Sequence, residues 1–170
     1  AEISQGTLHY IFEYQSMMAE LTGMDISNAS MYDGSTATAE AMMMAVAAGR
    51  KCDTVLVSET VDKKVLTVVE TYAKFHGVNI VMVKENEGIT DKADFQEKIA
   101  QKGVAGVIVQ QPNRYGIVED YAGYADAAHD NKALMIMNGV AADYAVLKTP
   151  AEWGADIAVG DGQSLGVPMM

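Results

Sequence analysis

The sequence predicts an α/β fold: a doubly wound, mostly parallel sheet with helices on both faces. Short apolar runs rich in β-branched residues have the length of buried strands, at residues 53–58, 78–83, 104–111, 133–137 and 155–159. Helical patterns separate most of these runs, and strands that are apolar on both faces with helical connections are typical of parallel sheets covered on two sides. Their spacing of about 20 residues suits right-handed crossovers.

Composition limits the class of protein and its partners. With 170 residues and 49% hydrophobic content, the chain fits one α/β domain over residues 1–170. Its net charge of −11 makes nucleic acid and anionic membrane poor partners. No apolar run approaches the roughly 20 residues of a membrane span. Because Ala1 is not an initiator methionine and a helical pattern starts almost at once, we expect the domain to be cut at both ends from a longer polypeptide.

The first half of the chain predicts three helices. Apolar residues recur at helical spacing from Ser4 to Leu21, which predicts an amphipathic helix that ends at Gly23. The stretch "NASMYDGSTATAEAMMMAVAAG" predicts a turn that opens a very apolar helix. A third helix is expected from Asp62 to Phe75, with Gly77 as its C-terminal stop.

The second half continues the alternation of strands and helices. Thr90 is expected to cap a helix whose first turn carries Asp91 and Asp94, where the helix dipole favours acids. A further helix is expected from about Val118 to Asp130. Thr149 precedes a proline, which predicts an N-cap and a short turn of helix before the last strand.

The local feature most suggestive of a binding site is the turn at Asp33 and Gly34, followed by Ser35 and Thr36. Free N–H groups and hydroxyls at a helix start can hold a phosphate. Alternatively, Asp33 or Ser35 is an ordinary N-cap, and the small residues let the helix pack close to the sheet. The glycines and lysine of a Walker A loop and the glycines of GxGxxG are missing, which disfavours a plain nucleotide site.

Two amide-bearing stretches follow predicted strands. Gln110, Gln111 and Asn113 lie at the end of one strand, where their side chains either face a crevice or bond only to loop backbone. Asn138 follows the strand at 133–137 in a similar position.

The histidines and the cysteine do not form a recognisable site. His9, His76 and His129 are scattered without partners at metal-ligand spacing, so we expect surface or capping roles and no metal. Cys52 is the only cysteine, which excludes an internal disulfide and favours a structural role in a reducing, cytoplasmic setting.

Four stretches together resemble one family. They are "AEISQG", "LTGMDISNASMYDGSTATAEA", "VIVQQPN" followed by "GIVED", and "GADIAVGDGQSLGVP", in order and over nearly the whole chain. The chain resembles the P-protein of the glycine cleavage system, and in particular the first subunit of its two-subunit forms. The resemblance implies the large domain of a fold-type-I enzyme dependent on pyridoxal phosphate (PLP), without the family's upstream region and smaller C-terminal domain.

The resemblance also implies where the cofactor site would be. In active members a lysine in the loop after the last strand forms the Schiff base, but this chain has Gln163 and Ser164 there, and Lys148 lies before the strand. Neither a Gln nor a Ser can supply the imine-forming amine. The acid expected at the end of 133–137 is the amide Asn138. We therefore expect no catalytic residue and no bound PLP in this chain, and a vestigial cradle at Asp33, Gly34, Ser35, Thr36, Asn138, Gln163 and Ser164.

The implied function is that of a subunit. It would support decarboxylation of glycine and transfer of the aminomethyl group to the lipoyl H-protein, in a heterotetramer with a PLP-bearing second subunit, and would be inactive in isolation. One alternative is a self-sufficient PLP enzyme that uses a lysine elsewhere. Another is a small-molecule-binding module of flavodoxin or Rossmann type, which would need a phosphate loop after its first strand.

Overall fold

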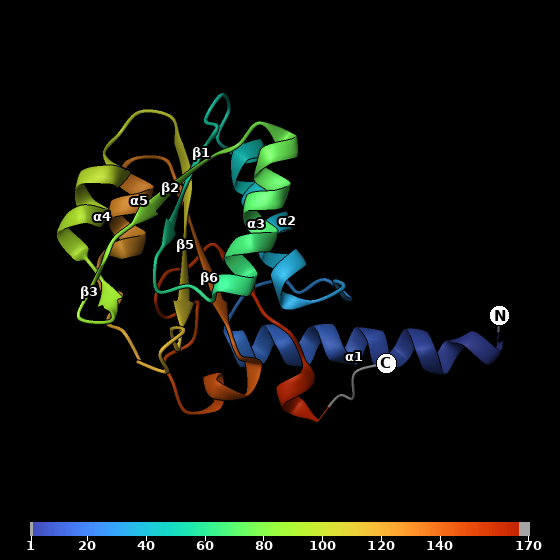
Figure 1. The fold of residues 1–170 in the computed structure, drawn as a ribbon. Coiled ribbons are helices and arrows are strands. Elements are labelled where there is room, and N and C mark those ends of the chain that lie inside the picture. Colours follow the sequence, from blue (N-terminus) through green and yellow to red (C-terminus); the bar gives the residue numbers. More distant parts are fainter. Residues whose placement is uncertain (1, 167–170) are drawn as a thin grey trace.

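A computed structural model describes residues 2–166, and its centre is one five-stranded sheet (Figure 1). The strand order is β2-β1-β5-β6-β7, and every neighbouring pair is parallel. The chain moves outward from β1 to β2 and then continues on the other side of β1, so the order reverses between β1 and β5. The strands are β1 (Thr54–Ser58), β2 (Asn79–Val83), β5 (Val104–Gln111), β6 (Leu134–Gly139) and β7 (Ile157–Val159).

Helices cover both faces of the sheet, which confirms the doubly wound α/β prediction. Figure 1 shows α2 and α3 on one face and α4 and α5 on the other. These helices are α2 (Gly34–Ala48), α3 (Lys63–His76), α4 (Lys92–Ile99) and α5 (Tyr124–Asp130). No helix among residues 2–166 is both long and apolar enough to cross a membrane.

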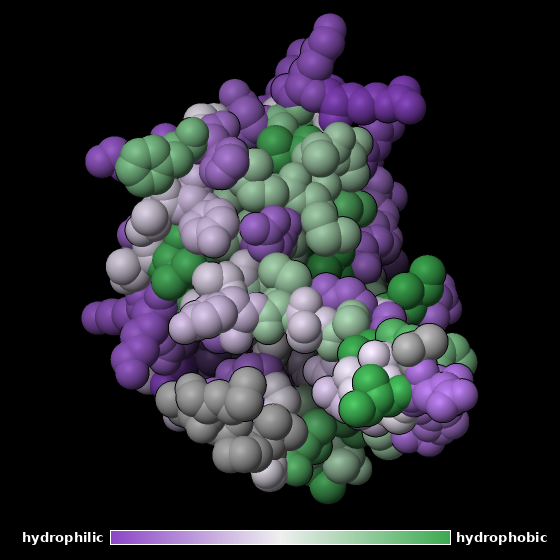
Figure 2. All heavy atoms as spheres, turned by 90° about the vertical axis from the view of Figure 1, so that its right-hand side faces the viewer, coloured by the Kyte–Doolittle hydropathy of each residue, from purple (hydrophilic) through white to green (hydrophobic). Residues whose placement is uncertain are grey.

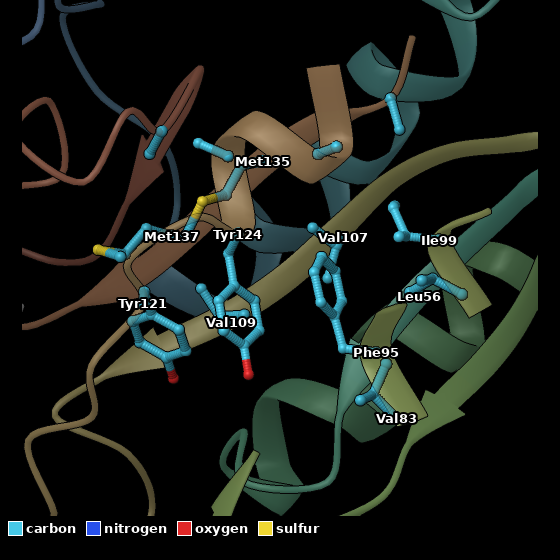
Figure 3. Packing of buried hydrophobic residues seen from close by; sticks show 14 of the residues in the cluster. Leu56, Val83, Phe95, Ile99, Val107, Val109, Tyr121, Tyr124, Met135 and Met137 are labelled. Carbon is cyan, nitrogen blue, oxygen red and sulfur yellow. The ribbon is translucent and has the colours of Figure 1, made fainter. Parts of the chain in front are cut away.

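Alternation along the strands divides the core into two layers. Val55 and Ile108 pack toward α2 and α3, whereas Leu56 and Val107 pack toward α4 and α5. In the second layer, shown in Figure 3, the rings of Phe95 and Tyr124 stack with centroids 4.3 Å apart. Both faces of the central strands are therefore buried, as the continuous apolar runs in the sequence predict.

Helix α1 (Gln5–Thr22) projects from this body like an arm (Figure 1). It ends where predicted, because Gly23 takes a left-handed conformation with φ of 72°. Its C-terminal half contacts the short helix η2, while residues 2–10 are all exposed. The remaining short elements are η1 (Glu2–Ser4), the antiparallel pair β3 (Glu85–Asn86) and β4 (Ile89–Thr90), η2 (Ala141–Ala145) and η3 (Gln163–Leu165).

The predicted helix from Val118 to Asp130 is wrong over its first half, since α5 begins only at Tyr124. Tertiary hydrogen bonds hold the preceding segment in an extended form. The Gln111 side-chain amide donates to the Glu119 carbonyl at 2.8 Å, and its oxygen accepts from the Glu119 N–H at 3.0 Å. The Tyr121 hydroxyl donates to the Gln110 carbonyl at 3.0 Å, and the ring of Tyr121 is fully buried.

Of two further predicted caps, one needs correction and one is confirmed. Asp91, rather than Thr90, is the N-cap of α4, because its carboxylate accepts from the Ala93 and Asp94 N–H groups at 2.9 and 3.1 Å. Thr90 instead belongs to β4. Thr149 caps a short turn as predicted: its hydroxyl accepts from the Glu152 N–H at 3.3 Å, and its carbonyl accepts from the Trp153 N–H at 3.2 Å.

The stacked core gives a stability prediction. Phe95→Ala should lower the free energy of unfolding by about 3–5 kcal/mol, because it leaves a cavity beside Tyr124. The matched control is Phe75→Ala at a helix position that is 80% exposed, which should change stability by less than about 0.5 kcal/mol. Denaturant titration measures both values, and equal losses for the two variants would contradict this packing.

Candidate functional site

The candidate residues gather at the carboxyl edge of the sheet, where ligands bind in open α/β folds. The start of α2 lies against the loop after β7. A Cβ added to Gly34 would lie 3.2 Å from the carbonyl carbon of Gly160 and 3.5 Å from the backbone nitrogen of Asp161. Asn138 of β6 pairs in register with Val159, which directly precedes this loop. The structure thus brings the Asp33–Thr36 turn, Asn138 and the loop carrying Gln163 and Ser164 to one edge.

The helix start is capped by its own side chain. The Asp33 carboxylate accepts from the Thr36 N–H at 2.7 Å and from the Thr36 hydroxyl at 2.8 Å, while the Asp33 N–H donates to that hydroxyl at 3.2 Å. The backbone hydrogen bond from Thr36, followed by the hydroxyl bond, lowers the pKa of Asp33, so this carboxylate is charged at neutral pH. The N-cap interpretation of Asp33 is confirmed, and a carboxylate already uses the Thr36 N–H that a phosphate would need.

A second acid stands at the same helix start. Oδ2 of Asp161 lies 3.5 Å from the position that a Cβ on Gly34 would occupy, and Oδ1 accepts from the Gln163 N–H at 3.2 Å. Two carboxylates therefore flank the first turn of α2. Like charges repel, so this arrangement disfavours a phosphate despite the favourable helix dipole.

The end of β6 carries a neutral amide network. Asn138 is only 7% exposed, and its Nδ2 donates to Oε1 of Gln110 at 3.5 Å. The same Gln110 oxygen accepts from the Asp62 N–H at 2.8 Å, which ties the end of β5 to the start of α3. An amide cannot provide the negative charge that would keep a pyridine nitrogen protonated.

The other amides of the "QQPN" stretch stabilise a loop. Gln111 is buried and bonds both sides of its amide to Glu119, as described above. Asn113 donates to the Gly88 carbonyl and the Glu119 carboxylate at 2.8 and 2.7 Å, and its oxygen accepts from the Tyr115 N–H at 2.9 Å. These two side chains therefore bond to neighbouring loops rather than face a crevice.

Close backbone packing fills the space between these elements. A Cβ on Gly139 would lie 2.6 Å from the Gln111 carbonyl oxygen and would overlap the Tyr144 hydroxyl. A Cβ on Gly160 would overlap the Gly139 carbonyl oxygen. Tyr144 is 6% exposed, and its hydroxyl has no hydrogen-bond partner among the described residues. Burial, with a smaller contribution from Asp143, raises the pKa of this hydroxyl, so it stays neutral.

The loop after β7 offers an amide and a hydroxyl but no amine. Gln163 and Ser164 are exposed in η3, and the Ser164 hydroxyl accepts from the Ala142 N–H at 3.2 Å. Lys148 is engaged elsewhere, with its Nζ 4.1 Å from the centre of the Trp153 ring. The described residues at this edge therefore do not fit PLP, since they provide neither the lysine nor the acid. The closing residues 167–170 of the predicted loop lie outside the described part.

The remaining candidate groups form no site of their own. His9 bonds to Glu13, and His129 to Asp156, each at 2.9 Å. His76 stacks loosely on Tyr72, with ring centroids 6.4 Å apart. Within residues 2–166, no three His, Cys, Asp or Glu side chains converge as metal ligands.

Two hydrogen bonds join the loops where the strand order reverses. The Arg114 N–H donates to the Thr60 carbonyl at 2.9 Å, and the Asp62 N–H donates to Gln110. These bonds join the ends of β1 and β5, where a flavodoxin or Rossmann module would bind its ligand. The segment 59–62 that follows β1 contains no glycine, so it does not form the phosphate loop that this alternative needs.

Sequence reasoning missed Asp161 and Tyr144 as parts of this edge. The signal for Asp161 was its place in a glycine-rich loop directly after a strand, where an acid next to a helix start affects anion binding. Tyr144 had no such signal, because its contact with Gly139 depends on how η2 folds back over the sheet.

The fold is shared with enzymes of several activities. The chain superimposes on the crystal structure of a cystathionine gamma lyase from Micromonospora echinospora with a TM-score of 0.69, over 85% of its length and 35% of that chain, at 20% identity. At this identity the likeness concerns the fold alone. The chain has the α/β large-domain architecture of fold-type-I PLP-dependent enzymes.

Closer comparisons define the family. The family described as "Glycine cleavage system P-protein" matches residues 1–170, and the chain belongs to it. It is 49% identical over 168 residues to the probable glycine dehydrogenase (decarboxylating) subunit 1 of Moorella thermoacetica, and 47% identical to that of Desulforamulus reducens. Both matches cover 99% of this chain but 37% of the relative.

A solved structure agrees with this assignment. The crystal structure of glycine decarboxylase (P-protein) of the glycine cleavage system, in inhibitor-bound form, superimposes with a TM-score of 0.91 at 42% identity. The match covers 99% of this chain and 37% of that one.

The capped helix start predicts a pH-dependent stability. Asp33→Ala should lower the free energy of unfolding at pH 7 by about 1 kcal/mol. Because the folded-state pKa lies below the ordinary 3.8, the Asp33 contribution is complete above that value and is lost as the pH falls through the lower folded value.

Asp33→Asn is the matched control for this prediction. Asparagine caps helices about as well as aspartate, so stability at pH 7 should change by less than about 0.5 kcal/mol, while the acid-dependent component disappears. Urea titrations at pH 7 and between pH 2 and 4 measure both effects. An Asp33→Ala variant as stable as the parent at pH 7 would rule out the cap.

Proposed function

We propose that this chain is part of the subunit of glycine decarboxylase that does not carry the cofactor. The reaction served is decarboxylation of glycine, with transfer of the aminomethyl group to the lipoyl arm of the H-protein. The observation that carries the proposal is the pairing of a P-protein fold with a carboxyl edge that has Gln163, Ser164 and Asn138 where the cofactor chemistry needs a lysine and an acid.

The residues of the edge have a structural role in this proposal. Asp33, Gly34, Ser35, Thr36, Asn138, Gln163 and Ser164 are a vestigial cradle. The self-capped start of α2 and the nearby Asp161 support this assignment, because both place negative charge where a phosphate would bind. Residues 1–170 would form the large domain of the subunit. The chain would contribute no catalytic residue and bind no metal.

The cofactor would then belong to a partner. The similar relatives are named "subunit 1", which supports a second subunit in their assembly. We propose that the second subunit binds PLP, that the two form a heterotetramer, and that the complex works in the cytoplasm. The H-protein would be a transient partner and glycine the substrate of the complex.

A self-sufficient PLP enzyme is the less supported alternative. It needs a lysine at the Asp33–Thr36 turn, yet the sequence has no lysine or arginine among residues 149–170. Lys148, the nearest in sequence, packs on Trp153.

Reconstitution tests the proposed division of labour. The full-length protein containing this chain should release no CO2 from glycine alone and should do so with its second subunit, PLP and H-protein. Gln163→Ala should change the reconstituted rate by less than about threefold, as expected for an exposed residue outside the chemistry.

Replacing the cofactor lysine of the second subunit by alanine is the matched control, and it should abolish the reaction. If the full-length protein releases CO2 without its partner, or if Gln163→Ala is as damaging as the lysine variant, the proposal fails.

A further inference from the structure

The outer edge of β2 is one end of the described sheet, and its sequence is prone to strand pairing. Residues 78–83 read "VNIVMV", an uncharged and mostly apolar run without proline. The strand order leaves the outer side of β2 without a neighbouring strand among residues 2–166. Segments of this kind pair readily with other strands when they lie at a sheet edge. An unprotected edge here would therefore favour association between protein molecules.

Alternate residues at this edge direct their backbone groups outward. Asn79 and Val83 both bond to residues that flank β1, the first through its N–H at 2.7 Å and the second through its carbonyl at 2.9 Å. Because the residues that pair with one neighbour alternate along a parallel strand, the other residues point their N–H and C=O groups away from β1. These outward residues are Ile80, Met82 and Lys84, of which the last directly follows β2.

Helix α4 and its N-cap already occupy three of these outward groups. Nζ of Lys98 donates to the Met82 carbonyl at 2.8 Å. Oδ2 of Asp94 accepts from the Lys84 N–H at 2.8 Å, and the Lys84 carbonyl accepts from the Asp91 N–H at 2.9 Å. A strand that paired over Met82 and Lys84 would have to displace all three bonds. The carboxyl half of the edge is thus closed by residues of the chain itself.

The two charged side chains hold each other in place. Nζ of Lys98 also donates to Oδ2 of Asp94 at 2.6 Å, one helical turn away, and the side chains are 19% and 14% exposed. Burial raises the pKa of the Asp94 carboxyl, but the bonds from Lys98 and the Lys84 N–H outweigh it and leave the pKa below its ordinary value. The adjacent residues Phe95 and Ile99 are buried in the core. The packing of α4 therefore anchors a charged pair at the edge.

Charged side chains alone do not mark a protected edge. Figure 2, which views the molecule from the side of α2 and α3, shows hydrophilic residues spread over that face as well. What distinguishes Lys98 and Asp94 is that they bond to outward backbone groups at an edge strand. Lysines at the edge and helices that cover it are two means by which natural sheets avoid edge-to-edge pairing.

We propose that Lys98 and Asp94 form a guard that closes the outer edge of β2 and prevents the addition of a further strand there. The inference does not depend on the proposed function. It applies to every candidate strand, because the bonded groups are equally unavailable to the rest of a longer protein, to a partner and to a second copy. A strand that displaced the guard would also bury an ammonium without its hydrogen-bond partners, which is costly.

Hydrogen exchange of the full-length protein containing this chain tests the closed edge without any substitution. The outward amides of Ile80 and Met82 should exchange about tenfold faster or more than the amide of Val81, which pairs with β1. Asp94→Ala should raise the exchange rate of the Lys84 amide about tenfold or more, because it removes a hydrogen bond to a charged group. Mass spectrometry with fragmentation to single residues measures these rates. Equal protection of Ile80, Met82 and Val81 would show a strand paired beyond β2 and overturn the inference.

Self-association of the full-length protein tests the guard itself. Lys98→Met keeps a long side chain but removes the ammonium, so the half-time of association should fall about threefold or more. Thioflavin T fluorescence and sedimentation velocity measure this half-time. Lys98→Arg retains a charged donor and should behave like the parent.

Two further variants separate an open edge from other causes. Lys102→Met removes an equal charge from the exposed turn after α4 and should leave the half-time unchanged. Asp33→Ala weakens a helix cap without opening an edge and should also associate more slowly than Lys98→Met. If Lys98→Met associates no faster than Lys102→Met, the guard is wrong. If Asp33→Ala associates as fast as Lys98→Met, lost stability is the cause and the inference is again overturned.

Discussion

Backbone contact between glycines is the constraint on which the carboxyl edge of this sheet depends. Gly34, Gly139 and Gly160 each lie where a Cβ would meet another backbone segment or overlap it. These contacts bring the start of α2, the end of β6 and the loop after β7 within reach of one another. The chain thus keeps a carboxyl edge of the kind that binds ligands in open α/β folds. The side chains around this edge decide which chemical groups it could hold.

Those side chains are acidic or neutral, and each of them bonds to a neighbouring residue. Asp33 caps its own helix, Asp161 stands beside it, and Asn138 shares an amide network with Gln110. Such groups stabilise the fold, but they offer neither a nucleophilic amine nor a positive charge for a phosphate. Under the proposed function, this chain maintains the architecture, while a partner subunit carries the reactive groups.

The fold could be predicted from the sequence because its signals are local and periodic. All five apolar runs became strands of one sheet, and the helix stops at Gly23 and Gly77 were correct because glycine adopts the required left-handed conformation. The start of α5 could not be predicted, since the bonds from Gln111 to Glu119 join separate parts of the chain. Asp33 could be recognised as a capping candidate because an N-cap is a local feature of the sequence. The contact of Tyr144 with Gly139 has no such local signal, because it depends on how η2 folds back over the sheet. The pattern of α1 predicts an amphipathic helix but does not reveal what its apolar side chains face.

Subunit-specific trapping of the cofactor tests the central claim most directly. The reconstituted complex is incubated with PLP and reduced with borohydride, and the two subunits are then separated and weighed by mass spectrometry. The account predicts one pyridoxyl group on a lysine of the second subunit and no stoichiometric label on the protein containing this chain. A full equivalent of label on a single lysine of this chain would contradict it.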